Sequence, residues 1–228
     1  MEVLAFLPCR KGSERIVNKN TKKFLEFEHG LLEIKINQLL SAKYIKNILI
    51  STNDELIIEY IKKINSTRIL LDKRTNSLSS SKTSTDELIK YAGSLFNDGH
   101  ILWTHVTSPF INASRYDEII CTYFKALTEG YDSLMTTTPI RSFLWDRNGP
   151  INYMRNIEKW PRTQTLKTIH EINSGVFLSN LSNYRNHSDR IGLKPYLYEI
   201  DKITGHDIDW EEDFYLAEMI LKSKMATL

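Results

Sequence analysis

Residues 3–24 of the chain read VLAFLPCRKGSERIVNKNTKKF, a short apolar run that opens into a strongly basic loop. The run at 3–7 is typical of a parallel strand covered on both faces. Pro8 cannot donate a ladder hydrogen bond and marks the end of this strand. The loop holds six Lys and Arg residues against one acid, Glu14, while the whole chain has a net charge of only +2. Backbone N–H groups and cationic side chains in such a loop predict a polyphosphate site.

The length and composition of the chain are those of an ordinary globular protein. The 228 residues are 41% hydrophobic and 25% charged, which predicts one large domain over 1–228. The small net charge gives no case for binding nucleic acid. Cys9 and Cys121 show no spacing typical of disulfides or zinc. Without a signal peptide or a long apolar span, we expect a cytoplasmic protein with no membrane partner.

Strand and helix patterns alternate through the first part of the chain. Short apolar runs predict strands, and helical spacing with capping residues predicts helices between them. Strands are expected at 48–51, 68–71, 100–106, 132–138 and 196–200, with helices at 31–42, after Thr52, after Ser84 and after Asn112. This order predicts an α/β fold: a doubly wound, mostly parallel, Rossmann-like sheet with ligands at the carboxyl ends of the strands.

Residues 139–172 break the alternation. This stretch contains Phe143, Trp145, Tyr153 and Trp160, and Gly149-Pro150 marks a turn. Aromatic residues of this density are typical of an interface, so we expect a small dimerisation excursion. A β-hairpin packed on its own domain is the simpler alternative.

A second acidic motif lies near the other end, in GHDIDWEEDFYLAEMI at 205–220. Asp207 and Asp209 are two residues apart, so their side chains share one face of an extended segment. Two such carboxylates can hold Mg²⁺, or Mn²⁺ as the alternative ion, against a triphosphate. An isolated D-x-D is also common on protein surfaces. Asp209, with Glu212 three residues on, is also expected to cap the last helix.

The basic loop contains neither GxxxxGK[ST] nor GxGxxG. It resembles the N-terminal signature of the acylneuraminate (CMP-sialic acid) cytidylyltransferase family, although Glu14 stands where that family usually has Lys. The matching positions are Arg10, Gly12, Ser13, Arg15, Ile16, Lys19 and Asn20. The string D-I-D-x-x-E-D-F at 207–214 is similar to the family's C-terminal signature. The resemblance covers the chain from end to end, with looser motifs in the middle.

The resemblance implies roles for particular residues. Those implied to bind the nucleotide are Pro8, Cys9, Arg10, Gly12, Ser13, Arg15, Lys19, Asn20, Arg74 and Thr85. Those implied to bind the second substrate are His105, Thr107, Ser108, Arg162, Gln164 and Asn173. Catalysis is assigned to Arg10, Lys19 and Asp209, and the metal ion to Asp207 and Asp209.

The implied reaction is transfer of CMP from CTP to an acidic sugar, sialic-acid-like or another ulosonic acid, with release of pyrophosphate by a homodimer. His105 and Ile111 replace Gln and Arg of the family motif, so the acceptor is not necessarily N-acetylneuraminate. Two alternatives stay open. A nucleotide-sugar glycosyltransferase also uses a D-x-D site, and a catalytically inactive relative would bind nucleotide without turnover.

Overall fold

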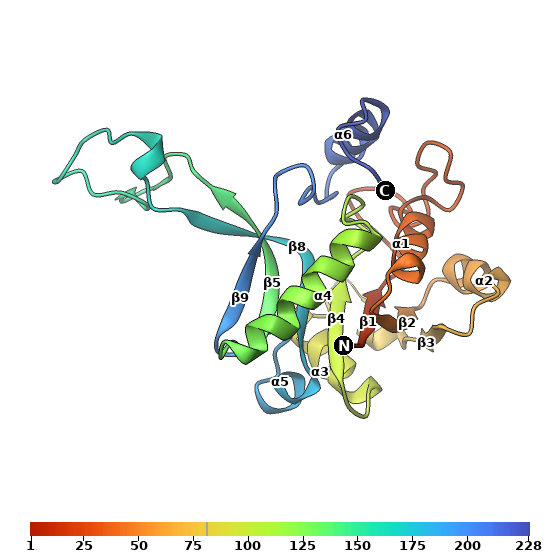
Figure 1. Cartoon of the computed structure of the whole chain (residues 1–228). Helices are drawn as coiled ribbons and strands as arrows, with labels where there is room; N and C mark the ends of the chain where they lie inside the picture. Colours follow the sequence, from red (N-terminus) through yellow and green to blue (C-terminus); the bar gives the residue numbers. More distant parts are fainter. Residues whose placement is uncertain (81) are drawn as a thin grey trace.

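The computed structural model describes residues 1–80 and 82–228, and its centre is one seven-stranded sheet in the order β3-β2-β1-β4-β8-β5-β9 (Figure 1). Its strands are β1 (Val3–Pro8), β2 (Ile45–Thr52), β3 (Ile69–Lys73), β4 (His100–Thr104), β5 (Ser133–Ile140), β8 (Ile169–Asn180) and β9 (Pro195–Glu199). The helices are α1 (Gly30–Ser41), α2 (Glu55–Lys63), α3 (Thr85–Leu95), α4 (Ala113–Thr128), α5 (Leu181–Asn186) and α6 (Glu211–Lys222).

The sheet is mostly parallel, as predicted. Strands β1 to β4 run parallel to one another and β9 runs parallel to β5, whereas β8 is antiparallel to both β4 and β5. The sequence pattern did not predict that β8, a late strand, lies between β4 and β5. Strand order depends on contacts between distant segments, which local periodicity does not report.

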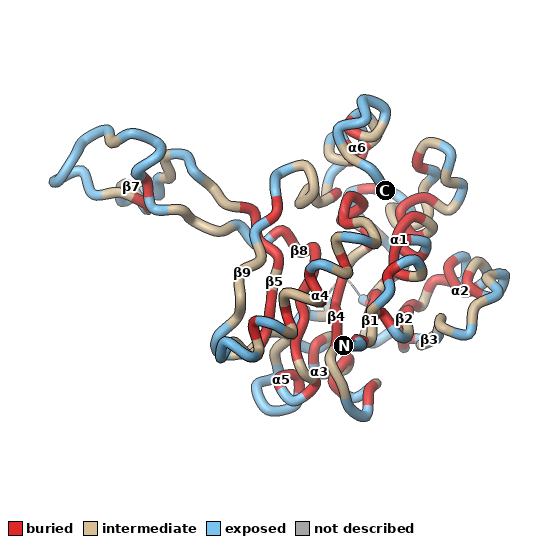
Figure 2. The backbone as a smooth tube through the Cα atoms, viewed as in Figure 1, coloured by how far each residue is buried: buried red, intermediate tan, exposed pale blue. Residues whose placement is uncertain are grey.

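Helices cover both faces, so the sheet is doubly wound. Along β1, Ala5 and Leu7 point into a core shared with α1, α2, α4 and α6, whereas Phe6 points into a second core with α3 and α5. Alternate side chains of a strand point to opposite faces, and burial on both sides explains why β1 reads as a continuous apolar run. Figure 2 shows the inner strands of the sheet mostly buried, the edge strands β3 and β9 intermediate or exposed, and the outward sides of the helices exposed. Within the described residues, no helix has both the length and the apolar character needed to cross a bilayer.

Two predicted helix starts are confirmed and two are wrong. Ser84 and Glu87 form the capping box of α3, and Asn112 caps α4. Helix α2 is capped by Asp54, which accepts a hydrogen bond from Leu56 N, and not by Thr52, which ends β2. At α6 the accepting carboxylate is Asp213, bonded to the backbone N–H groups of Trp210 and Asp209. The Asp209 side chain is unavailable as a cap because it pairs with cations of the basic loop.

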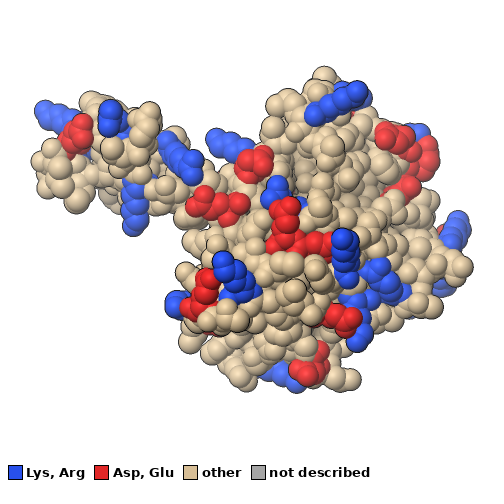
Figure 3. All heavy atoms as spheres, viewed as in Figure 1, with Lys and Arg blue, Asp and Glu red and all other residues tan. Residues whose placement is uncertain are grey.

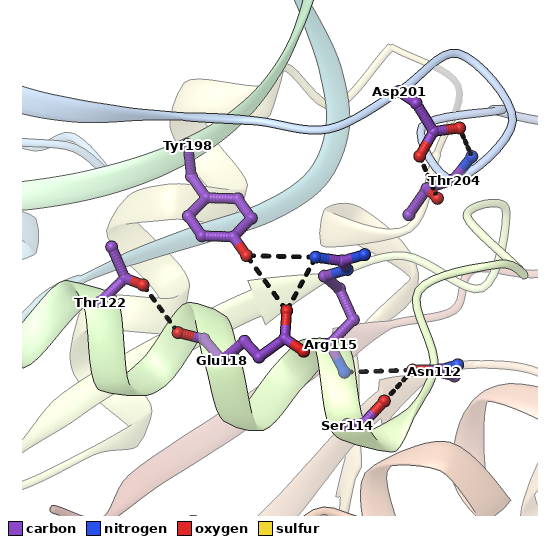
Figure 4. A network of polar contacts seen from close by, with 8 residues as sticks. All are labelled: Asn112, Ser114, Arg115, Glu118, Thr122, Tyr198, Asp201 and Thr204. Atoms are coloured by element: carbon purple, nitrogen blue, oxygen red, sulfur yellow. Dashed lines mark hydrogen bonds and ion pairs between the residues drawn. The ribbon is translucent and has the colours of Figure 1, made fainter.

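Polar contacts fix the end of β9, from which the chain leads to the acidic motif. Arg115 Nη1 on α4 donates to Glu118 Oε2 at 2.7 Å and to Tyr198 Oη of β9 at 3.4 Å (Figure 4). Beyond β9, the Asp201 carboxylate accepts hydrogen bonds from Ile203 N and from both N and Oγ1 of Thr204. These contacts hold the turn that precedes Asp207.

Residues 141–168, here called the arm, connect β5 to β8 and project away from the body of the protein (Figure 1). The arm contains the two-residue strands β6 (Trp145–Asp146) and β7 (Gly149–Pro150) and the 3₁₀ turn η2 (Thr163–Thr165). Phe143 packs edge-on against Tyr153 and Trp160 at 5.3 and 5.5 Å between ring centroids. Most of the arm is exposed or half-buried (Figure 2). It projects from the main sheet and does not lie along it (Figure 1), and its role in a dimer stays a prediction.

Candidate active site

A cavity of about 280 Å³ lies where β1 and β4 end, beside the basic loop. We call it the basic cavity. Its lining residues are Pro8, Arg10, Ser13, Glu14, Arg15, Ile16, Lys19, Asn20, Arg74, Leu88, His105, Val106 and Thr107. Four of these side chains are Lys or Arg and one is Glu. This composition favours an anionic ligand at the carboxyl edge of the sheet, where open α/β folds bind their ligands.

The basic loop is held by its own contacts. Ile16 is fully buried in the core, and Asn20 Nδ2 donates to the carbonyl of Arg10 at 3.1 Å. Gly12 has a φ of +81°, a left-handed conformation that glycine adopts without strain, and its carbonyl accepts a bond from Arg10 Nη1. The loop is therefore anchored at Ile16 and Asn20, while its cations Arg10, Arg15 and Lys19 line the cavity.

Lys19 joins this loop to the acidic motif at the other end of the chain. Its Nζ donates to the carbonyl of Ile208 at 2.7 Å and lies 3.3 Å from Asp209 Oδ1. Arg15 Nη1 lies 3.3 Å from Asp209 Oδ2, and its guanidinium stacks on the ring of Trp210. Asp209 is thus placed among the cations of the basic cavity.

Arg74 is the most deeply buried cation of the cavity. Its residue is 5% exposed, and among the described residues its Nε and Nη2 have no hydrogen-bond partner. Burial lowers the pKa of its guanidinium. A buried donor that lacks an acceptor costs free energy, and a ligand that supplies an acceptor removes this cost.

His105 stands at the end of β4 as a neutral ring. Burial, with the positive charges of Arg190, Lys19 and Lys35, lowers its pKa to about 3. Its Nε2 lies 3.0 Å from the indole Nε1 of Trp103, which can only donate. The proton of the neutral imidazole is therefore on Nδ1. His105 can donate from Nδ1, but it has no free nitrogen lone pair with which to act as a general base.

A lysine of α1 that was given no role from the sequence supports the turn after β4. Lys35 of α1 is fully buried and donates to the Ser108 carbonyl and to Tyr116 Oη, both at 2.8 Å. Burial holds the pKa of Lys35 well below its usual value. Gln38 donates to the Pro109 carbonyl at 2.6 Å. A lysine within the apolar stripe of α1 was the only sequence signal for this role.

A second cavity of about 600 Å³, here called the acidic hollow, lies next to α6. Its lining residues are Thr138, Glu171, Ile172, Asn173, Ser174, Lys202, Gly205, His206, Asp207, Asp209, Trp210 and Asp213. Asp207 Oδ1 is buried without a hydrogen-bond partner among the described residues. Burial, reinforced by the charge of Asp209, raises the pKa of Asp207.

The acidic hollow fits a divalent ion held partly by substrate. The described residues contain no group of three or more His, Cys, Asp or Glu that could bind a metal alone. Mg²⁺ sites in nucleotide enzymes commonly use one or two carboxylates together with phosphate oxygens and water. The unpartnered Oδ1 of Asp207, beside Asp209, meets that requirement.

Asn173 is fixed by an irregularity in β8. The register with β5 shifts between Met135 and Thr137, and Ser174 adopts a left-handed φ of +57°. Asn173 Oδ1 accepts bonds from Thr136 Oγ1 and Gly175 N, while Nδ2 donates to Thr138 Oγ1. The irregularity thus lies next to Asn173, and a bulge of this kind re-aims neighbouring side chains.

The structure gathers nine of the predicted site residues in the basic cavity: Pro8, Arg10, Ser13, Arg15, Lys19, Asn20, Arg74, His105 and Thr107. Asn173, Asp207 and Asp209 line the acidic hollow. Gly12 and Thr85 are exposed residues that line neither of these two cavities. Arg162 and Gln164 lie exposed on the arm.

Three other assignments receive a structural explanation. Cys9 and Ser108 are each 1% exposed and line neither cavity, and burial raises the pKa of the Cys9 thiol to about 12. Ile111 is fully buried, and its side chain packs where a Cβ on Gly175 would lie. The replacement of the family's Arg at this position therefore alters the core and not the lining of either cavity.

The fold and the paired cavities define a nucleotidyltransferase. A family model described as Cytidylyltransferase matches residues 4–224. The chain therefore belongs to the cytidylyltransferase family, whose members use a divalent metal ion.

Similar proteins are known by sequence. An N-acylneuraminate cytidylyltransferase of Escherichia coli O18:K1:H7 is 24% identical over 98% of the chain, which spans 53% of that protein, about half its length. A pseudaminic acid cytidylyltransferase of Campylobacter jejuni subsp. jejuni is 26% identical over 97% of both chains.

Solved structures share the fold. CMP:2-keto-3-deoxy-manno-octonic acid synthetase complexed with CTP gives a TM-score of 0.66 with 10% identity, over 98% of this chain and 100% of the other. A 4-diphosphocytidyl-2C-methyl-D-erythritol synthase gives 0.67 with 10% identity, over 96% and 98%.

Proposed function

We propose that this protein transfers CMP from CTP to an acidic sugar of the sialic-acid-like or ulosonic class and releases pyrophosphate. The observation that carries the proposal is the basic cavity, which Arg10, Arg15 and Lys19 line together with Arg74, whose buried Nε and Nη2 have no hydrogen-bond partner among the described residues. The relatives named for N-acylneuraminate and pseudaminic acid support the same reaction class.

The reaction is a single in-line displacement. A hydroxyl oxygen of the sugar forms a bond to the α-phosphorus of CTP, the bond from that phosphorus to the bridging oxygen breaks, and pyrophosphate leaves. The hydroxyl proton passes to solvent. His105 does not accept it, because Nε2 already accepts a hydrogen bond from Trp103 and Nδ1 carries the ring proton. Catalysis then rests on holding the two substrates in line and on stabilising phosphate charge.

Each part of the site has a task in this scheme. Arg10, Arg15 and Lys19 cradle the triphosphate, and the backbone at Pro8 and the guanidinium of Arg74 contact the nucleoside. Asp207 and Asp209 would hold Mg²⁺, with Mn²⁺ as an alternative, and the ion would supply neutralisation of charge on the phosphates. On binding CTP, Arg15 and Lys19 exchange part of their contact with Asp209 for phosphate oxygens.

The arm belongs to a homodimer in this proposal. Trp145, Ile151, Met154, Ile157 and Trp160 are all exposed on it, which is a large apolar surface for one small projection. Figure 3 shows Lys and Arg side chains on the arm. In the proposed dimer, Arg162 and Gln164, both exposed at the 3₁₀ turn η2, reach the acceptor side of the other subunit's cavity. The partner's arm thereby completes each site.

The test is pyrophosphate release from CTP with a panel of acidic acceptors: N-acetylneuraminate, pseudaminate, legionaminate-type acids and other ulosonic acids. We expect turnover with CTP and at least one of these acids, and none with neutral hexoses. Parallel reactions with ATP, GTP and UTP serve as controls. Nucleotide binding without turnover on any acceptor would instead support the inactive relative, and transfer from a preformed nucleotide sugar would support a glycosyltransferase.

A further inference from the structure

Ile208 lies between the two carboxylates proposed to hold the metal ion, and its backbone is held from two sides. Its N–H donates to the carbonyl of Thr107 at 2.9 Å, and its carbonyl accepts a bond from Lys19 Nζ at 2.7 Å. The Ile208 side chain is fully buried in the core. The positions of Asp207 and Asp209 therefore depend on where the turn after β4 places Thr107.

That turn is held by a cation to which the proposed reaction gives no task. Lys35 of α1 donates to the carbonyl of Ser108, next to Thr107, at 2.8 Å and to that of Ile111 at 3.5 Å. Lys35 is fully buried, and among the described residues no carboxylate oxygen lies within 4.0 Å of its ammonium. Burying a charge without a counter-charge is costly, and an apolar side chain of similar size would fill the same space. Stability alone therefore does not account for a lysine here.

A third hydrogen bond of Lys35 leads toward the acidic hollow. The ammonium donates to Tyr116 Oη at 2.8 Å, Tyr116 Oη lies 2.8 Å from Thr104 Oγ1, and Thr104 donates to the Gly175 carbonyl at 2.7 Å. Because the single hydroxyl proton of Thr104 goes to Gly175, Tyr116 donates to Thr104. The N–H of Gly175 in turn donates to Asn173, a lining residue of the acidic hollow. Lys35 is thus connected to the acidic segment through the turn and to Asn173 through this chain.

We propose that Lys35 is a positioning residue for the metal site: by fixing the turn after β4, it fixes Ile208 and the carboxylates on either side. This inference rests on the proposed function, in which these carboxylates would hold the metal ion together with the triphosphate. Lys35 lines neither cavity, so it acts through the backbone that it holds and not by contact with a substrate. Groups behind the ligands of a metal orient those ligands, and their loss lowers metal affinity or activity by about tenfold to a hundredfold.

The experiment compares Lys35→Met with the wild type. Methionine has an unbranched, flexible side chain that fills an apolar setting, and it removes all three N–H donors. The first readout is amide exchange of Ile208 in the unliganded protein, measured by NMR relative to the amides of β1. The second is the Mg²⁺ concentration that gives half-maximal pyrophosphate release with CTP and an acidic acceptor. Arg68→Met is the matched control, because Arg68 also donates to backbone carbonyls, among them those of Leu40 and Ala42, but lines neither cavity.

In Lys35→Met we expect the Ile208 amide to exchange about tenfold faster relative to β1, the effect of one weakened hydrogen bond. The half-saturating Mg²⁺ concentration should rise by about tenfold to a hundredfold, while CTP affinity without metal matches the wild type. Arg68→Met should lower the melting temperature and leave both readouts unchanged. If Lys35→Met is recovered unfolded, Lys35→Gln, which keeps an amide donor, takes its place and should shift both readouts in the same direction.

An unchanged exchange rate at Ile208, or the same change in Arg68→Met, would overturn the assignment. Faster exchange with an unchanged Mg²⁺ requirement would show that Lys35 supports the fold alone, and it would overturn the assignment as well. A wild type that releases no pyrophosphate with any acceptor refutes the proposed function, which is a different result, because amide exchange still decides whether Lys35 places Ile208.

Discussion

Lys19 Nζ and Asp209 Oδ1 lie 3.3 Å apart although 190 positions separate them in the chain. The contact brings the basic loop after β1 against the acidic segment before α6. The loop proposed to bind phosphate and the segment proposed to bind the metal ion are thus in direct contact in the unliganded protein. In the proposed reaction, Lys19 exchanges Asp209 for a phosphate oxygen of CTP, so the ammonium keeps an ionic partner when the nucleotide binds.

Asp209→Asn should reduce turnover on the order of 10²- to 10³-fold, because one of two carboxylates that hold the metal is neutralised. The change is measured by pyrophosphate release at saturating Mg²⁺. Glu211→Gln is the control, since Glu211 also pairs with a loop lysine, Lys22 at 2.7 Å, but lines neither cavity. Wild-type turnover in Asp209→Asn would rule out the metal role. Its helix should stay intact, because Asp213 supplies the cap.

Arg74→Met should weaken CTP binding at least tenfold while leaving the melting temperature of the unliganded protein unchanged or higher. The reason is that the variant removes a buried cation whose Nε and Nη2 have no partner among the described residues. Calorimetry with CTP and with ATP, and thermal unfolding without nucleotide, give the two readouts. A marked fall in melting temperature without ligand would show that Arg74 supports the fold and not the nucleotide.

Acid should destabilise the protein through His105. Its folded-state pKa of about 3 lies below the ordinary value of about 6.5, so between these limits the unfolded chain binds one more proton. Stability contributed by the neutral ring is present above pH 6.5 and is lost as the pH falls toward 3. The free energy of unfolding, measured with urea, should fall between pH 7.5 and pH 5.5. This fall should be about 1 kcal/mol smaller in His105→Gln than in the wild type. The exposed His187→Gln should match the wild type.

The arm should make the protein a dimer. Light scattering of the 26.6 kDa chain is expected to give twice this mass at micromolar concentration. Ile157→Glu, at a position 73% exposed on the arm, should yield monomers, because it places a charge in the apolar interface. Leu193→Glu changes a residue outside the arm that is 82% exposed, and this variant should remain dimeric. A monomeric wild type would contradict the proposal.

Much of this site was predictable from sequence because its strongest signals are local. The basic loop and the D-x-D segment each carry their chemistry within a few residues, and Lys19 and Asp209 were assigned from those strings. Thr85 and Ser108 were assigned by motif position, yet Thr85 is exposed and Ser108 is in the core. Motif spacing does not say which way a side chain points.

Other features depend on long-range packing and left little trace in the sequence. Lys35 reads as one polar residue in a helix, and only the fold shows that it supports the turn at Ser108. Arg190 stacks on Phe177 and Trp103, which become neighbours only because β8 inserts beside β4. The unpartnered donors of Arg74 likewise require the assembled cavity.

The contact between Lys19 and Asp209 also sets an order of events during synthesis. A nascent chain that has emerged as far as β9 contains every strand of the sheet, yet its basic loop still lacks the acids at 207 and 209. Translation proceeds from the N-terminus, so the segment proposed to bind the metal ion leaves the ribosome after all strands of the sheet. Under the proposed function, catalytic competence comes after the sheet has been made, and a chain that stops short of Asp207 keeps the loop cations but lacks both carboxylates.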